Sequence, residues 1–270
     1  MTGAELGGAG SGLIFLLGLR HGLDPDHIAV IDNFTFRAAE ERQATAPWVG
    51  TLFAAGHSLS VAAIALLVAG FTARLTWPTR LSDAVDWTVI QLLVLVGVLN
   101  LRALLRQGRY TPAGWRQSLL SAKLRSSTHP FAIMATGVLF GLVFDTATQA
   151  AAWGAAASAR AGLAGAAVIA ALFAGGMILT DTADSRIVAA LLRTGGDVSG
   201  VGRYRRVVGW IIVALSFGMA AYALCTKVGW MRELSDARFT LMGATMASVV
   251  IGALLIERRR RNSASAQEAA

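Results

Sequence analysis

The chain has 270 residues, of which 55% are hydrophobic and only 15% are charged, with a formal net charge of +8. A soluble domain has roughly 45–50% apolar and about 25% charged residues, so this composition argues against a soluble protein. The positive charge does not call for a nucleic-acid partner, because membrane proteins carry excess lysine and arginine in their cytoplasmic loops. The single cysteine, Cys225, excludes a disulfide framework and a thiolate metal cluster within one chain.

Apolar blocks follow one another along the chain, and each is long enough to cross a hydrocarbon core, which takes about 20 helical residues. The seven blocks cover roughly residues 11–33, 48–72, 85–106, 130–158, 162–192, 207–226 and 238–257. Because lipid forces backbone groups to pair within a segment, we predict an all-α, polytopic membrane helix bundle of about seven transmembrane helices. The N-terminal stretch lacks the basic start of a signal peptide, so the first block is expected to be retained.

The basic residues predict how this bundle sits in the membrane. With seven crossings, sixteen of the 24 lysines and arginines fall on one side and six on the other. Cytoplasmic loops carry the excess of positive charge, so we expect the N-terminus outside and the C-terminus in the cytoplasm. The cytoplasmic set includes one loop with Arg193, Arg203, Arg205 and Arg206. We expect residues 1–258 to form a single transmembrane domain and the polar tail, 259–270, to be disordered.

The first apolar block has ionisable residues at its centre, in the run LGLRHGLDPDHIAVIDNF at residues 17–34. Such a group at the bilayer centre costs roughly 2.5–3.5 kcal/mol, so it indicates a functional site. On a helix His21 and Asp24 share a face, whereas His27 lies about 120° away. Pro25 lacks an N–H and clashes with the preceding turn, so we expect it to break the helix and let these side chains converge. The side chains expected to converge as metal ligands are His21, Asp24, Asp26 and His27. The alternative is a kinked helix whose histidines and aspartates simply pair with one another.

Two later blocks add further polar residues. His57 lies in FAAGHSLSV, where it is either a metal ligand or a hydrogen-bond partner between helices. In GLVFDTATQAAAWG, Asp145, Thr148 and Gln149 fall at i, i+3 and i+4, which makes one polar stripe on an alanine-rich helix. Gly137 and Gly141, just before that stripe, form a small-xxx-small pair that favours close helix packing.

The fifth block contains AGGMILTDTADSRIV, in which Asp181 and Asp184 share one helical face. Both are candidates for an ion path, with the alternative that Arg186 neutralises one of them in a salt bridge. The four polar segments together offer imidazoles, carboxylates and hydroxyls but no thiolate, which suits borderline divalent metals such as nickel, cobalt or zinc. The sequence has no His-Glu-x-x-His motif and no Gly-x-x-x-x-Gly-Lys-Ser/Thr loop, which argues against a zinc hydrolase and against ATP use by the chain itself.

The run RHGLDPDHIAVIDN resembles the signature of the nickel/cobalt transporter family of bacterial permeases, Arg-His-Ala-x-Asp-Ala-Asp-His-Ile-Ala-x-Ile-Asp-Asn. Three further signatures of that family follow in its order: GHSLSV, GLVFDTATQ and GMILTDTAD. The resemblance implies a permease of the bacterial cytoplasmic (inner) membrane that moves Ni²⁺ or Co²⁺, usually inward, driven by the proton motive force. The metal is then a transported substrate, and no bound cofactor, ATPase subunit or enzymatic activity is expected.

By position, the resemblance carries the role of metal ligand or filter residue to His21, Asp26 and His27, and a matching polar position to His57. Residues expected to support the ligands or to line the onward path are Asp32, Asp145, Thr148, Gln149, Asp181 and Asp184. An exporter of the same metals is an alternative reading, and a membrane metalloenzyme is an alternative from another class.

The sequence departs from the family pattern in three respects. Gly22 and Pro25 stand where the signature has alanine. Gln149 stands where the family commonly has glutamate, which removes one negative charge and one potential proton carrier. The chain has no room before the first motif for the extra helix that many members carry there. The choice between nickel and cobalt, the coupling ion and the oligomeric state do not follow from these residues.

Overall fold

The computed structural model describes residues 10–72, 79–106, 124, 126–142, 162–193, 198–232 and 234–268. Within these residues the chain is helical and has no β-strand, which confirms the predicted all-α membrane bundle. Helices long and apolar enough to cross a membrane there are Ala46–Phe71, Asp86–Leu105, Gly162–Arg193 and Val201–Lys227. Shorter apolar helices cover Pro130–Leu142 and Ala237–Gly252.

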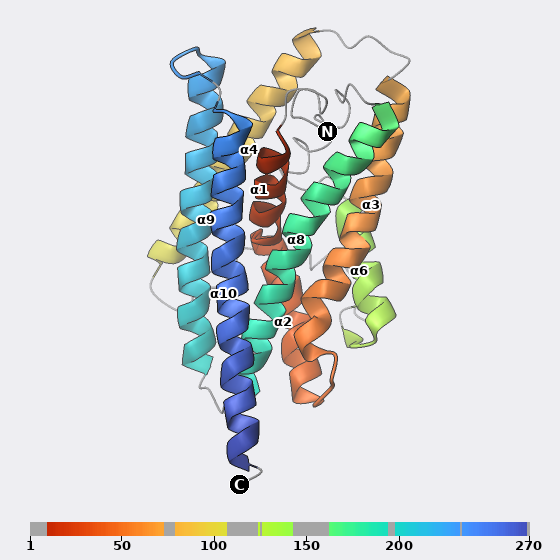
Figure 1. Cartoon of the computed structure of the whole chain (residues 1–270), viewed down its shortest axis with the longest axis vertical. Helices are drawn as coiled ribbons and strands as arrows, with labels where there is room; N and C mark the ends of the chain where they lie inside the picture. The colour runs from red at the N-terminus through yellow and green to blue at the C-terminus, as the bar shows by residue number, and fades with distance from the viewer. Residues whose placement is uncertain are drawn as a thin grey trace.

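The helices run along the length of an elongated bundle, with α8 crossing its centre (Figure 1). The elements are α1 (Ser11–Gly22), α2 (Pro25–Glu40), the 3₁₀ turn η1 (Ala46–Trp48), α3 (Val49–Thr72), α4 (Thr79–Leu105), α6 (Pro130–Leu142), α8 (Gly162–Arg193), α9 (Val198–Lys227) and α10 (Asp236–Glu268). Helix α8 packs against α1, α2, α3 and α10, α3 also packs against α6, and α9 packs mainly along α4. Helix α8 therefore contacts most of the other described helices.

The first apolar block is divided into two helices at Pro25. Helix α1 ends at Gly22, and Asp24 has φ −63° and ψ 137°, an extended conformation. The residue before a proline is pushed out of the helical region by the proline ring, which explains the conformation of Asp24. Pro25 then occupies the first turn of α2, where its missing N–H removes no helical hydrogen bond. The predicted break is confirmed.

Close contact between α3 and α6 depends on the glycine pair Gly137 and Gly141. A Cβ added to Gly137 would lie 2.9 Å from the backbone nitrogen of His57, and one added to Gly141 would lie 2.9 Å from its carbonyl oxygen. Real Cβ atoms do not approach other atoms so closely, so only glycine allows the two backbones to meet here. The pair thereby fixes the part of α3 that carries His57.

The structure differs from the predicted blocks in two places. Helix α9 begins at Val198, well before the predicted start at 207, so Arg205 lies inside a helix and not in a loop. Helix α10 continues to Glu268 and includes most of the tail expected to be disordered, because arginine, alanine and glutamine are all good helix formers. The division at residue 258, the number of crossings and the orientation stay predictions.

Candidate functional site

Three buried histidines from three helices meet at the break between α1 and α2. One ligand nitrogen from each of His21, His27 and His57 lies within 4.8 Å of the others, and all three side chains are 0% exposed. Their ring centroids are 4.6 to 5.1 Å apart. His21 ends α1, His27 opens α2 and His57 lies in α3, so the interruption at Pro25 is what allows the first two to face each other. We call these three residues the histidine cluster.

Two nitrogens of the histidine cluster, His21 Nε2 and His57 Nε2, are 3.1 Å apart. In the absence of an ion, one of them must donate a hydrogen to the other. Two imidazole nitrogens bound at about 2.1 Å to one metal lie about 3.0 Å apart at a right angle and about 3.4 Å apart at a tetrahedral angle. The observed separation therefore fits two neighbouring ligands of a single divalent ion.

A carboxylate lies behind His27. The Nδ1 atom of His27 is 3.2 Å from Oδ2 of Asp181, which is itself 0% exposed and comes from α8. A carboxylate that accepts the Nδ1 hydrogen fixes the imidazole tautomer and leaves the Nε2 lone pair for a metal. Among the residues that the structure describes, the second carboxylate oxygen of Asp181, the buried Oδ1, has no hydrogen-bond partner. When ionised, Asp181 gives the site a negative charge that the histidine hydrogen alone does not balance.

A second carboxylate approaches His21 from the extended residue between α1 and α2. Asp24 Oδ2 lies 3.8 Å from His21 Nδ1 and accepts a hydrogen bond of 3.3 Å from Arg20. Arg20 also donates to Ser216 Oγ on α9 at 3.1 Å. All of these side chains are buried, with exposed fractions of 4% or less. Arg20 therefore partly neutralises Asp24 and connects the histidine cluster to α9.

Aromatic rings enclose the histidine cluster. Phe53 contacts the His27 ring edge-on with centroids 4.9 Å apart, and Phe173 lies 5.1 Å from the His21 ring. Both phenylalanines are fully buried, in the apolar clusters that line α3 and α8. An apolar wall around neutral imidazoles excludes water and favours the binding of an ion that has lost part of its hydration shell.

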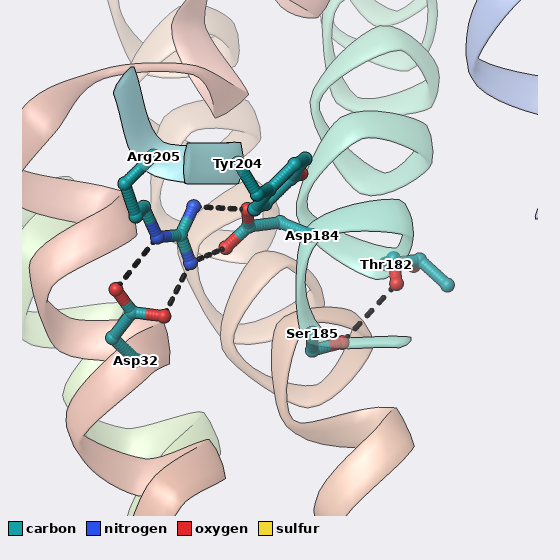
Figure 2. Close-up of polar contacts among 6 residues, drawn as sticks. All are labelled: Asp32, Thr182, Asp184, Ser185, Tyr204 and Arg205. Carbon is teal, nitrogen blue, oxygen red and sulfur yellow. Dashed lines mark hydrogen bonds and ion pairs between the residues drawn. The ribbon is translucent and has the colours of Figure 1, made fainter. Parts of the chain in front are cut away.

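A second buried polar group lies among α2, α8 and α9 (Figure 2). Arg205 is 3% exposed; its Nε donates to Asp32 Oδ2 at 2.8 Å and its Nη2 to Asp184 Oδ2 at 2.9 Å. Further contacts join Arg205 Nη1 to Asp184 and Arg205 Nη2 to Asp32. Tyr204 donates its hydroxyl hydrogen to Asp184 Oδ1 at 3.0 Å. We call Asp32, Asp184, Tyr204 and Arg205 the arginine cluster.

The predicted site residues are thus divided between two places. The histidine cluster contains His21, His27 and His57, with Asp181 and Asp24 against it. Asp26 is buried beside His27 but lies outside the group of mutually close ligand atoms. Asp32 and Asp184 lie in the arginine cluster. Asp145, Thr148 and Gln149 lie outside the described residues.

The partner of Asp184 differs from the one considered in the sequence. The cation that holds Asp184 is Arg205 of α9, while the guanidinium of Arg186 lies 5.4 Å from the centre of the Trp48 ring. Arg205 was assigned to a cytoplasmic loop, and that assignment is wrong because α9 begins earlier than its apolar run. A signal was present: Arg205 falls at i+4 of the buried stripe that begins at Val201 and continues at i+7 and i+11.

Comparison with known proteins shows to which protein family the chain belongs. A family model described as a high-affinity nickel-transport protein, NicO, matches residues 9–257. The chain belongs to this family. NicO proteins are transport proteins and not enzymes, which agrees with the prediction of no enzymatic activity. The family and the apolar helices together identify a multi-pass membrane protein.

Relatives of this NicO chain include proteins named for nickel transport and a protein named for cobalt transport. It is 34% identical over 213 residues to the nickel transporter NicT of Mycobacterium tuberculosis, covering 67% of this chain and 57% of that protein. It is 32% identical over 306 residues to the cobalt transport protein NhlF of Rhodococcus rhodochrous, covering 93% of this chain and 84% of that protein. The nickel transporter NixA of Staphylococcus aureus is 33% identical over 203 residues, covering 65% and 60%.

The chain spans little more than half the length of the first of these curated relatives, 57% of NicT. No solved structure matches the chain.

Proposed function

We propose that this NicO protein is a secondary transporter that moves Ni²⁺ or Co²⁺, or both, across the bacterial cytoplasmic membrane. The proposed direction is uptake driven by the proton motive force. The ion binds at the histidine cluster, with His21, His27 and His57 as nitrogen ligands. Asp24 and Asp26 stay candidate additional ligands, and the residues of the path include Asp181, Asp184 and Asp32. Asp145, Thr148 and Gln149 remain proposed parts of the path.

The observation that carries the proposal is the convergence of three fully buried imidazoles within 4.8 Å of one another. Buried polar side chains in a membrane bundle are costly, and three histidines at one point exceed what helix packing requires. Imidazole nitrogens suit nickel and cobalt, and the described part of the chain brings no thiolate to the cluster. The names of the relatives, nickel transporter and cobalt transport protein, agree with this ligand chemistry.

Coupling to protons follows from the ligand type. Histidine binds a metal only through a neutral ring nitrogen, so protons and metal compete for the same site. The ion therefore enters a site whose imidazoles are neutral, and the membrane potential, the electrical part of the proton motive force, draws its positive charge inward. The contact of 3.2 Å between His27 Nδ1 and Asp181 Oδ2 orients the His27 ring for metal binding.

The test is uptake of radioactive nickel and cobalt by cells that express His21→Ala or His27→Ala. Both variants are expected to lose uptake at low metal concentration. His129→Ala is the matched control, because His129 is exposed at the start of α6 and lies outside the cluster. Full uptake by both cluster variants, with normal expression in the membrane, would sink the assignment of the site.

The direction of transport is tested separately by growth in excess nickel. An importer makes cells more sensitive to the metal, whereas an exporter protects them. Protection would replace uptake by export and leave the metal site in place. A membrane metalloenzyme is disfavoured because the family is one of transport proteins.

A further inference from the structure

The arginine cluster holds more negative than positive charge. One guanidinium, that of Arg205, contacts two carboxylates, those of Asp32 and Asp184, and the Tyr204 hydroxyl donates to the second of them. With both carboxylates ionised the three charged groups sum to −1. An ion pair that serves only to hold helices together needs one carboxylate for one cation, and each extra buried charge adds a desolvation cost. Two carboxylates instead match the charge of a divalent cation.

Helices α2 and α8 lead from the histidine cluster and the adjacent Asp181 to the arginine cluster. On α8, Asp184 follows Asp181 by three residues, about 4.5 Å along the axis. On α2, Asp32 follows His27 by five residues, about 7.5 Å along the axis. Both helices run toward the same lower end of the bundle (Figure 1). That end carries the turn after α2, with Arg37 and Arg42 nearby, and is the side predicted to be cytoplasmic.

The arginine and the two carboxylates belong to different packing groups. Helix α8 packs closely against α1, α2 and α3, whereas α9, which carries Arg205, packs mainly along α4 and much less against α8. The polar links that α9 makes to the first group include Arg205 with its two aspartates, Tyr204 with Asp184, and Arg20 with Ser216. A lightly packed helix held by a charged contact is the kind of element that separates by rigid-body motion.

We infer that Arg205 is a tethered cation that closes the inner end of the ion path by occupying the Asp32–Asp184 carboxylate pair. The inference rests on the proposed function and adds a gate to it. The guanidinium and the divalent ion use the same two carboxylates at different times. When Arg205 withdraws with α9, Asp32 and Asp184 accept the ion that leaves the histidine cluster, and when Arg205 returns it displaces the ion toward the cytoplasm.

The first test locks α2 to α9 without altering the arginine cluster. Ile28 on α2 and Val208 on α9 pack in one buried apolar cluster. In a Cys225→Ser background, which removes the only native thiol, Ile28→Cys and Val208→Cys are joined by oxidation or by a short bis-thiol linker. The protein is reconstituted in liposomes and radioactive nickel transport is measured. Cross-linking is expected to stop transport, and cleavage of the link is expected to restore it.

A matched control joins two helices of the same packing group. The hydroxyl oxygens of Thr51 on α3 and Thr182 on α8 are 2.8 Å apart, so Thr51→Cys with Thr182→Cys is suited to form a disulfide. This link is expected to leave transport unchanged. Equal transport by the oxidised and the reduced Ile28/Val208 pair would overturn the gate.

The second test weakens the contact itself. Arg205→Lys keeps the charge but loses the bidentate fork, and Arg205→Gln removes the cation while keeping a hydrogen-bond donor and both carboxylates. Both are expected to raise nickel leak through liposomes that have no proton gradient, by about tenfold or more, because the closed arrangement loses its charge-assisted hydrogen bonds. Arg203→Lys, an exposed neighbour on α9, is the control and leaves the leak unchanged.

The two proposals fail in different ways. If the wild-type protein neither binds nor moves nickel or cobalt, the proposed function fails, and the gate fails with it. If the wild-type protein transports nickel but the two Arg205 variants, folded and with normal nickel binding, leak no faster than wild type, the gate alone fails and Arg205 is a static tie between helices.

Discussion

The two polar clusters of this protein share helix α2 but differ in how their charges are matched. In the arginine cluster, both carboxylates share one cation and accept donated hydrogen bonds. In the histidine cluster, three imidazoles face one another, and Oδ1 of the adjacent Asp181 has no hydrogen-bond partner within the part of the chain that the structure describes. The first cluster contains its own cation, whereas we propose that the second binds one that comes from outside the protein.

The difference shows how neighbouring residues acquire separate tasks. Asp181 and Asp184 are one helical turn apart on α8 and share a face, yet one supports His27 and the other holds Arg205. Sequence spacing placed them on one face, while the helices packed around α8 decide what each contacts. The predictions below, ordered by decreasing effect, each ask whether the two clusters are as distinct as their contacts indicate.

The largest effect is expected from Arg205→Ala. Removing the cation leaves the buried Asp184 and the partly buried Asp32 without a counter-charge, which we expect to cost about 3–5 kcal/mol of stability. Thermal unfolding of the purified protein in detergent measures it. Arg203→Ala, exposed on the same helix, should change stability by no more than about 0.5 kcal/mol. Equal melting temperatures for the two variants would show that the arginine cluster contributes little.

Next in size is the loss of metal binding in His27→Ala. Supporting residues alone are worth about 10–100-fold in metal affinity, so loss of a ligand is expected to cost more than about 100-fold. The wild-type protein should melt at a higher temperature when nickel is added, by about 2.7 kcal/mol of stabilisation at 100 times the Kd. The variant should show no such shift, while His129→Ala should keep it. A nickel-induced shift that survives in His27→Ala contradicts the histidine cluster as the site.

A smaller effect separates the two aspartates of α8. Asp181→Asn should lower nickel affinity by about 10–100-fold, because the amide holds the His27 ring less strongly than a carboxylate does. Asp184→Asn should keep nickel affinity within about threefold but lower stability, since its partner is Arg205 and not a histidine. Isothermal titration with nickel and thermal melting of both variants give the two numbers. The reverse pattern would mean that the clusters have been assigned the wrong way round.

The smallest effect is expected from Gly22→Ala at the end of α1. A Cβ there would overlap Thr180 Oγ1 and would lie 2.8 Å from Asp181 Oδ1. The side chains of Thr180 and Asp181 must both shift, which we expect to weaken nickel binding only a few-fold, less than removal of the Asp181 charge does. Nickel titration of the variant checks this. An effect as large as that of Asp181→Asn would show that the site does not tolerate such a shift.

The sequence predicted the residues of the histidine cluster better than those of the arginine cluster. The break at Pro25 follows from the chemistry of proline alone, and with it the approach of His21 and His27. The position of His57 against them depends on how α3 packs, so the sequence left two interpretations open. Similarity to a family signature added a reason to choose the ligand role, which stays a proposal.

Arg205 was missed because hydropathy does not mark where a helix begins. The run GRYRR looks like a loop, since three of its residues are arginines. Only the buried residues on either side, Val201 and Val208, reveal that Arg205 lies on the inner face of α9. The sequence also could not predict the partner of Asp184. Arg186 is close to Asp184 in the sequence, but this does not reveal which helix packs against Asp184.

The rigidity of α8 links the two clusters thermodynamically. Asp181 and Asp184 are fixed to one helix, so a tilt that draws Asp184 from Arg205 also moves the carboxylate behind His27. Coupling between two sites is reciprocal: if release of Arg205 changes metal affinity by some factor, bound metal changes the strength of the Arg205 contact by the same factor. Because Asp181 and Asp184 are three residues apart on one helix, we expect metal binding at the histidine cluster and the Arg205 contact to depend on the same conformational equilibrium.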